Sequence, residues 1–202
     1  MIQVPALAVE FRTFESIPYP FEPASGLSIM PTAAAFSTME ILRNGQRVEI
    51  RALRPQDREE MLAAVGRTST QSLYRRFFTV RRHFSEAETS FFLNLDFVSH
   101  VALVAVVEED GKSVIAGGGR YVVIKPGQAE VAFAVVDQFQ GQGIGAALLR
   151  HLSSLARKAG LREFVAEVLP DNAAMLKVFE KSGLEVATRR ESQTIHVVLQ
   201  LA

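Results

Sequence analysis

The chain of 202 residues contains no cysteine, has no excess of charge of either sign and lacks long apolar runs. Without cysteine it forms neither disulfides nor a thiolate nucleophile, which is compatible with a reducing compartment. Its 22 basic and 22 acidic residues cancel, so no overall field favours nucleic acid or an anionic membrane. No apolar run reaches the roughly 18 residues of a membrane helix, and the N-terminus lacks the basic start of a signal peptide. We therefore expect a cytoplasmic protein with no membrane and no nucleic-acid partner.

Histidine is also scarce, and no two histidines have the spacing of metal ligands: the four are His83, His100, His151 and His196. We therefore expect no metal site. Arginines interleaved with aromatic residues form one cluster, which comprises Arg75, Arg76, Arg81 and Arg82. At helical spacing, this pattern is more typical of a solvated helix face over core aromatics than of a nucleic-acid site.

Composition divides the chain in two. Residues 1–40 hold five of the eight prolines, and four glutamates against one arginine. This stretch is typical of an irregular N-terminal arm or linker. Residues 41–202 are then expected to form one domain.

Apolar periodicity in the domain predicts the element order β-α-α-α-β-β-β-α-β-α-β. The strands are expected at 48–53, 100–107, 113–124, 129–136, 162–169 and 187–201, the last as a strand or hairpin. The helices are expected at 54–65, 68–78, 85–95, 144–160 and 171–183. We expect Ser69 or Thr70 to cap the second helix, Ser85 and Glu88 to form a capping box, and Gly66 to follow the first helix. A right-handed crossover would make the strands around helix 144–160 parallel, so the predicted fold class is α/β with a mixed sheet.

A glycine-rich loop, QGQGIG at residues 140–145, joins a predicted strand to the longest predicted helix. Backbone N–H groups at a helix N-terminus attract phosphate groups, and glycine allows close approach and positive φ angles. A dinucleotide-binding loop of the G-x-G-x-x-A type is one alternative. It is disfavoured because the loop comes late in the chain and only about 30 residues follow the next strand. A Walker loop is excluded, because no Gly-Lys-Ser/Thr follows the glycines.

The segment VVDQFQGQGIGAALL resembles the pyrophosphate loop of the GNAT superfamily of N-acetyltransferases, Q/R-x-x-G-x-G/A, with Gln140, Gly143 and Gly145 in the motif positions. The segment DNAAMLKVFEKSGLEV resembles the second family signature, with Asn172 and Gly183 in place. The resemblance covers residues 47–202 and includes the element order. Within the superfamily, the chain is most similar to the catalytic domain of bacterial protein lysine acetyltransferases of the Pat type.

The resemblance implies that acetyl-CoA lies between two splayed strands, near 131–136 and 163–169. Its pyrophosphate would rest on the backbone of the loop, which comprises Gln140, Gly141, Gln142, Gly143, Ile144, Gly145 and Ala146. The pantetheine arm would pair with the main chain near Phe133 and Val135, and Asn172 would hydrogen-bond it. Relatives often carry Arg or Lys where this chain has Gln142, so the loop is expected to rely on backbone dipoles.

The resemblance also implies a catalytic base. A lysine amine has a pKa of about 10.4, so a general base is needed at neutral pH. Glu130 is the candidate, because it opens a strand between apolar residues that would raise its pKa. The tyrosine that often protonates the leaving thiolate is replaced by Phe179. Neither Tyr74 nor Tyr121 is expected at the site.

We therefore expect an acetyl-CoA-dependent N-acetyltransferase that acts on a primary amine by direct attack. A protein lysine and a small amine are alternative acceptors. Phe179 and Gln142 leave open a third alternative, a CoA-binding regulatory domain with little activity. The sequence fixes neither the acceptor nor the oligomeric state.

Overall fold

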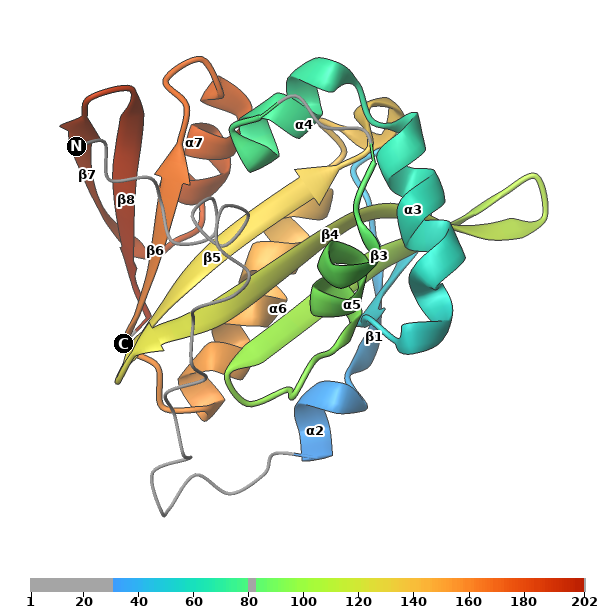
Figure 1. Ribbon diagram of the computed structural model, residues 1–202, viewed down its shortest axis with the longest axis horizontal. Coiled ribbons are helices and arrows are strands. Elements are labelled where there is room, and N and C mark those ends of the chain that lie inside the picture. Colours follow the sequence, from blue (N-terminus) through green and yellow to red (C-terminus); the bar gives the residue numbers. More distant parts are fainter. Residues whose placement is uncertain (1–30, 80–82, 202) are drawn as a thin grey trace.

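The computed structural model describes residues 31–79 and 83–201, which form a mixed sheet with helices on both faces (Figure 1). Eight strands lie side by side in the order β1-β2-β3-β4-β5-β6-β8-β7. Their bounds are β1 Ser37–Ile41, β2 Arg47–Ala52, β3 His100–Glu109, β4 Lys112–Lys125, β5 Gln128–Val135, β6 Glu163–Val168, β7 Glu185–Glu191 and β8 Thr194–Gln200. Neighbouring strands are antiparallel except β5 and β6, which are parallel. The predicted mixed sheet is confirmed, and the last segment is a hairpin.

The sheet begins earlier than predicted. Residues 31–40 contain a short helix, α2 (Pro31–Ala34), and most of strand β1, which pairs with β2 at the edge of the sheet. The interpretation of this stretch as irregular is therefore wrong for these elements. β1 escaped detection because its apolar residues Met39 and Ile41 are exposed, so it lacks a buried alternating face. Residues 1–30 lie outside the described residues.

The helices divide between the two faces of the sheet (Figure 1). A 3-10 turn, η1 (Pro55–Asp57), and the helices α3 (Arg58–Arg67), α4 (Thr70–Phe77) and α5 (Glu86–Leu93) lie on one face. Helix α6 (Ile144–Lys158) covers the other face and buries the predicted stripe of Ile144, Leu148, Leu152 and Leu155. Helix α7 (Ala173–Glu180) follows β6 and packs against α6. Within residues 31–79 and 83–201, no helix is long and apolar enough to cross a membrane.

Two of the predicted helix ends are confirmed and one is wrong. The Ser69 hydroxyl accepts a hydrogen bond from the Ser72 N–H and so caps α4, and Ser85 forms the expected capping box before α5. However, Gly66 lies inside α3 rather than beyond it. Side chains fix this last turn, because Arg67 donates to Glu60 Oε1 at 2.6 Å and Thr68 donates to the carbonyl oxygen of Ala64 at 2.8 Å.

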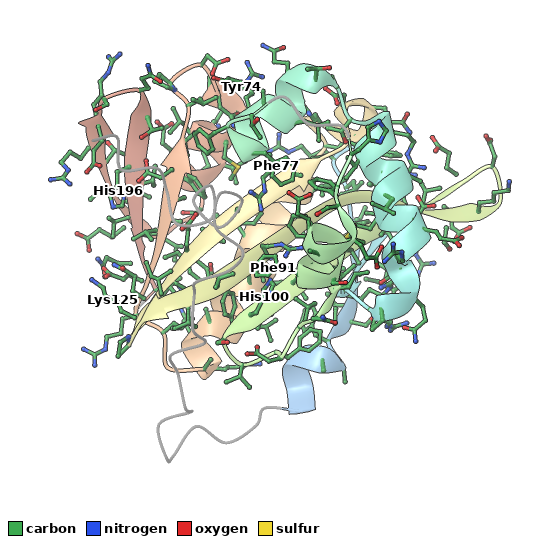
Figure 2. All side chains as sticks on the ribbon, viewed as in Figure 1. Tyr74, Phe77, Phe91, His100, Lys125 and His196 are labelled. Carbon is green, nitrogen blue, oxygen red and sulfur yellow. The ribbon has the colours of Figure 1, made fainter. Side chains whose placement is uncertain are left out.

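Phe77, Phe78 and Phe84, near the arginine cluster, are half-buried, so the expectation that these aromatic residues belong to the core is met only in part. The ring of Phe84 lies 5.3 Å from Phe77 and 5.1 Å from Phe92, both in edge-to-face geometry. Figure 2 shows Phe77 beneath α4, whereas Tyr74 lies on the outer side of that helix and is exposed. Arg81 and Arg82 lie outside the described residues.

Candidate active site

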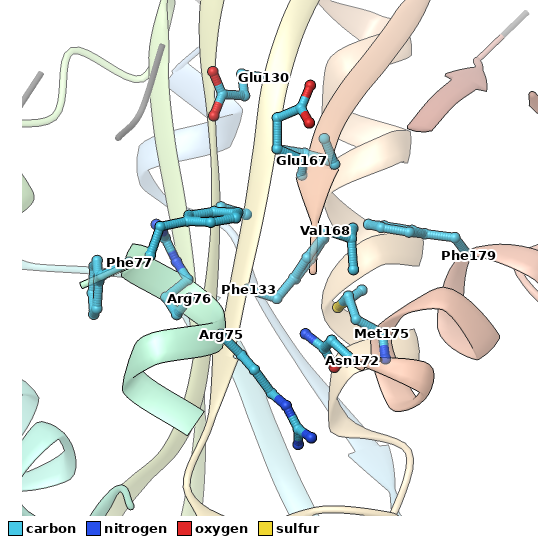
Figure 3. Close-up of a pocket in the computed structure, with 14 residues that line it drawn as sticks. Arg75, Arg76, Phe77, Glu130, Phe133, Glu167, Val168, Asn172, Met175 and Phe179 are labelled. Carbon is cyan, nitrogen blue, oxygen red and sulfur yellow. Dashed lines mark hydrogen bonds between the residues drawn. The ribbon is translucent and has the colours of Figure 1, made fainter. Parts of the chain in front are cut away.

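Strands β5 and β6 separate soon after they begin to pair. They pair in parallel only from Gln128 to Glu130 on β5, whereas β5 continues to Val135 and β6 to Val168. A pocket with about 520 Å³ of empty space, part of it open to solvent, lies at the separation (Figure 3). The splayed pair that the family resemblance implies is therefore present.

The pocket is lined from both faces of the sheet. Helix α4 contributes Arg76 and Phe77 from one face. Helix α7 and its N-cap contribute Asn172, Met175 and Phe179 from the other (Figure 3). A ligand that enters from the α7 side can therefore meet a second ligand from the α4 side between the strands.

The glycine loop joins a 3-10 turn, η2 (Asp137–Phe139), to the N-terminus of α6. Gly141 has φ +75° and Gly143 has φ +103°, conformations that only glycine adopts without strain. Gly143 is the N-cap of α6, and no described side chain caps the helix there. The first N–H groups of α6 therefore remain available for an anion.

Two glutamines hold the loop in place. Gln140 Nε2 donates to the carbonyl oxygen of Val135 at 3.0 Å and to Ser72 Oγ at 3.1 Å. Gln142 Nε2 donates to the carbonyl oxygen of Gln138 at 3.1 Å. Because these side chains bind other parts of the protein, the loop presents its backbone to a ligand.

The turn between β1 and β2 lies against the same loop. The Arg43 N–H donates to the carbonyl oxygen of Gln142 at 3.1 Å, and Asn44 Nδ2 donates to Gln142 Oε1 at 3.1 Å. The Cγ and Nε atoms of Arg43 lie 3.8 and 3.9 Å from the position a Cβ would take at Gly143. Within the described part of the chain, no acceptor pairs with the Arg43 guanidinium. Gln142 supplies no positive charge to the loop. In the fold, the guanidinium group of Arg43, from the turn between β1 and β2, lies beside the loop instead.

The other predicted cofactor residues take different positions. Phe133 and Asn172 line the pocket. The Asn172 Oδ1 atom caps α7, which leaves its amide nitrogen for a ligand. Val135 lies at the end of β5, outside the pocket lining, with its carbonyl oxygen occupied by the loop. Ile144 is buried and Ala146 is half-buried, so these two offer chiefly backbone groups.

Glu130 lies where the strands begin to separate and is only 7% exposed. Side chains alternate along a strand, and Phe133 faces Leu152 of α6, so Glu130 faces α4 instead. There the half-buried Arg76 interacts with it electrostatically. Burial lowers the pKa of Arg76 to about 10, and the attraction to Glu130 opposes that shift. Its apolar neighbours in sequence point to the opposite face, but the register places Val122 and Val165 beside Glu130, so its setting combines apolar side chains with the charge of Arg76.

A second carboxylate lines the same pocket and was not among the predicted site residues. Glu167 lies two residues beyond Val165, the β6 partner of Glu130, so strand alternation places both carboxylates on the α4 face. Its Oε1 atom lies 2.6 Å from His196 Nδ1, and its Oε2 atom accepts from Thr194 Oγ1 at 2.7 Å. Figure 2 shows His196 on β8. The alternation of side chains along β6 was visible in the sequence. The register that pairs Val165 with Glu130, and so places Glu167 near Glu130, comes only from the fold.

No tyrosine occupies the pocket among the described residues. Tyr121 is buried against Phe164, with ring centres 5.6 Å apart, and burial raises its pKa. Tyr74 is exposed on α4. Phe179 lines the pocket, with its ring 6.2 Å from that of Phe133.

The split sheet and the glycine loop at the N-terminus of α6 define the class of protein. The uncapped N-terminus of α6 offers backbone N–H groups to an anion, and the separated strands form a pocket with two carboxylates. This is the arrangement of an acyltransferase that uses coenzyme A. The profile of the Acetyltransferase (GNAT) family matches residues 67–184. The chain belongs to this family and is an acetyl-CoA-dependent N-acetyltransferase.

Relatives and solved structures agree with the family assignment. An acetyltransferase of Pseudomonas aeruginosa is 33% identical over 165 residues, which are 81% of this chain and 88% of that protein. Acetyltransferase Pat of Mycolicibacterium smegmatis is 32% identical over 178 residues, 86% of this chain but 52% of Pat. The crystal structure of the GNAT domain of S. lividans PAT has a TM-score of 0.74 at 32% identity and covers 81% of this chain and 96% of that one. The chain thus spans about half the length of the M. smegmatis relative. The predicted resemblance to Pat-type domains is confirmed.

Proposed function

We propose that the chain acetylates the side-chain amine of lysine residues in proteins, with Glu130 as the general base. The similarity to proteins named Pat supports a protein acceptor. The observation that carries the proposal is the position of Glu130, a buried carboxylate in a pocket that both faces of the sheet line.

For acetyl-CoA, we propose that the pyrophosphate binds the backbone of residues 140–146. The pantetheine arm then follows the main chain of β5 near Phe133 and Val135, like an added strand. Asn172 donates from its amide nitrogen to the arm. Arg43 supplies the positive charge that Gln142 lacks. The open N-terminus of α6 and the position of Arg43 over Gly143 support this arrangement.

The acceptor must lose a proton before it attacks. A lysine amine has a pKa of about 10.4, so about one in a thousand or fewer is neutral at pH 7. Glu130 accepts one proton from the ammonium group. The nitrogen then attacks the thioester carbonyl carbon, and a C–N bond forms as the C–S bond breaks. The second proton leaves the nitrogen for the thiolate or solvent. Because Phe179 has no proton to give, we propose that the thiolate leaves without a side-chain acid, which suits a thiol with a pKa of about 8.5.

The test compares Glu130→Gln with a matched control, Glu163→Gln. Glu163 lies on β6 and hydrogen-bonds Gln128 and Gln200, outside the pocket lining. Acetyl-CoA turnover is measured with a lysine peptide, spermidine and an amino sugar. Glu130→Gln should lower kcat by about 10²- to 10⁴-fold, the usual contribution of a general base. Both variants should keep the thermal stabilisation that acetyl-CoA gives to the wild type.

Three outcomes contradict the proposal in different ways. Undiminished turnover in Glu130→Gln removes the assignment of the base. Acetylation of the small amines but not of the peptide transfers the function to a small acceptor. Acetyl-CoA binding without turnover on any acceptor identifies a CoA-binding regulatory domain.

A further inference from the structure

Each charged side chain of the pocket lies near one of opposite charge, except Glu167. Arg75 Nη2 lies 3.0 Å from Asp171 Oδ2, and Arg76 is attracted to Glu130. Among the described residues, neither a lysine nor an arginine pairs with Glu167; its partners are the Thr194 hydroxyl and the His196 imidazole. With His196 as a neutral imidazole, the pocket therefore carries a net negative charge at Glu167.

The Glu167 carboxylate is held in a fixed orientation. Its side chain is 15% exposed, and each oxygen has one partner, from Thr194 or His196. A carboxylate only accepts hydrogen bonds, so His196 Nδ1 carries the proton, which the neutral imidazole already provides. Because two carboxylate oxygens offer about four acceptor positions, Glu167 can accept further hydrogen bonds from a ligand.

We propose that Glu167 binds the ammonium group of the acceptor and presents it to Glu130, and that His196 positions Glu167. This proposal rests on the proposed function, because it assigns the amine to the same pocket. Figure 3 shows both carboxyl groups at one end of the pocket, on neighbouring strands. The protonated amine is the abundant form at neutral pH, so a site that binds the ammonium group raises the concentration of acceptor beside the base.

The two carboxylates have separate tasks in this scheme. Glu130 takes the proton and changes its charge during the reaction. Glu167 forms and breaks no covalent bond and stays ionised. Loss of Glu167 should therefore weaken acceptor binding, whereas loss of Glu130 should slow the chemical step.

The test measures binding without turnover, in protein saturated with CoA. The probes are Nα-acetyl-lysine amide and its uncharged analogue, Nα-acetyl-norleucine amide, and calorimetry gives their Kd values. Glu167→Gln should raise the Kd of the lysine probe by about 10- to 100-fold, as for loss of a hydrogen bond to a charged group. The Kd of the norleucine probe should not change. His196→Ala should have a smaller effect in the same direction, and His196→Asn, which keeps an N–H donor, should restore part of the affinity.

Glu40→Gln is the matched control. Glu40 Oε1 lies 2.7 Å from His151 Nε2, so this variant breaks a carboxylate–imidazole pair of the same kind, between β1 and α6 and away from the pocket lining. It should leave both Kd values unchanged. Thermal unfolding of each variant checks that it folds.

Steady-state kinetics with acetyl-CoA and a lysine peptide separate this inference from the proposed function. Glu167→Gln should raise the acceptor KM with little change in kcat. The inference is overturned by wild-type protein that does not prefer the lysine probe, by unchanged affinity in Glu167→Gln, or by a loss confined to kcat. If Glu130→Gln retains full turnover, the assigned base fails, whatever Glu167 does.

Discussion

Replacement of Gly119 by alanine should destabilise the core and disturb the pocket between β5 and β6. Gly119 is the last of three successive glycines in β4. A Cβ there would lie 2.7 and 2.8 Å from the Cδ1 and Cε1 atoms of Phe133 and 3.0 Å from Leu152 Cδ1. These distances are too short for carbon atoms, so the Phe133 ring must move. A Cβ added at Gly118 would point to the opposite face, where its nearest neighbour is the carbonyl oxygen of Leu103 at 3.4 Å.

Two opposing effects set the size of the loss. Overpacking of a dense core costs about 1–3 kcal/mol. Exchange of glycine for alanine restricts the unfolded chain and returns about 0.4–1 kcal/mol. The net destabilisation of Gly119→Ala should therefore lie between about 0 and 2.6 kcal/mol, with a middle value of about 1.3 kcal/mol, or a Tm lower by about 3–5 °C for a chain of this size. Gly118→Ala should stay within about 0.5 kcal/mol of the wild type.

Urea unfolding of the two alanine variants measures the difference in stability. Because Phe133 lines the pocket, Gly119→Ala should also bind acetyl-CoA more weakly, and a thermal shift at several ligand concentrations measures this. The steric reasoning is refuted if Gly119→Ala is as stable as Gly118→Ala.

Two further predictions concern pH and ionic strength. Burial, and to a lesser degree the charge of Arg120, lowers the pKa of His100 from 6.5 to about 3, so the native state keeps it neutral while the unfolded chain binds a proton below pH 6.5. Stability should therefore fall by about 1.6 kcal/mol between pH 6.5 and pH 5, with a slope that approaches about 1.4 kcal/mol per unit well below pH 6.5. Urea unfolding of His100→Gln should show a smaller fall, and identical falls would contradict the assignment. Arg43→Ala should raise the Kd for acetyl-CoA about two- to fivefold at low salt and less at high salt, as for an exposed ion pair. The exposed Arg47 on β2 serves as the control, and equal affinities of Arg43→Ala and Arg47→Ala would count against a phosphate contact.

Elements with a strong local period were predictable, and elements defined by their neighbours were not. The stripe of α6 predicted a helix over 144–160, and the structure has Ile144–Lys158. Strand β1 was missed because its apolar side chains are exposed, and only pairing with β2 makes it a strand. The closing hairpin stayed undecided because β7 is mostly exposed and shows no apolar alternation.

The residues of the candidate site also divide into those that the sequence predicted and those that only the fold brings together. The glycine loop and Glu130 lie in motifs that are contiguous in sequence. Arg43, Arg76 and Glu167 come from a turn, a helix and a strand that only the fold brings to the loop and pocket. The residues that surround Glu130 could not be predicted from its sequence neighbours, for a related reason. Residues adjacent in a strand point to opposite faces, so sequence neighbours are not the surroundings of a strand side chain.

In the proposed scheme, one face of the split sheet recognises the cofactor and the other recognises the acceptor. The loop and Asn172 lie within residues 67–184, which match the family profile. Thr194 and His196, which hold Glu167, lie on β8 and beyond that match. If Glu167 binds the acceptor amine, the C-terminal hairpin sets how firmly the amine is held without altering the acetyl-CoA site. Substitutions in β8 should then change the acceptor KM and leave the Kd for acetyl-CoA unchanged, so relatives that share the loop can differ in their acceptors through this hairpin.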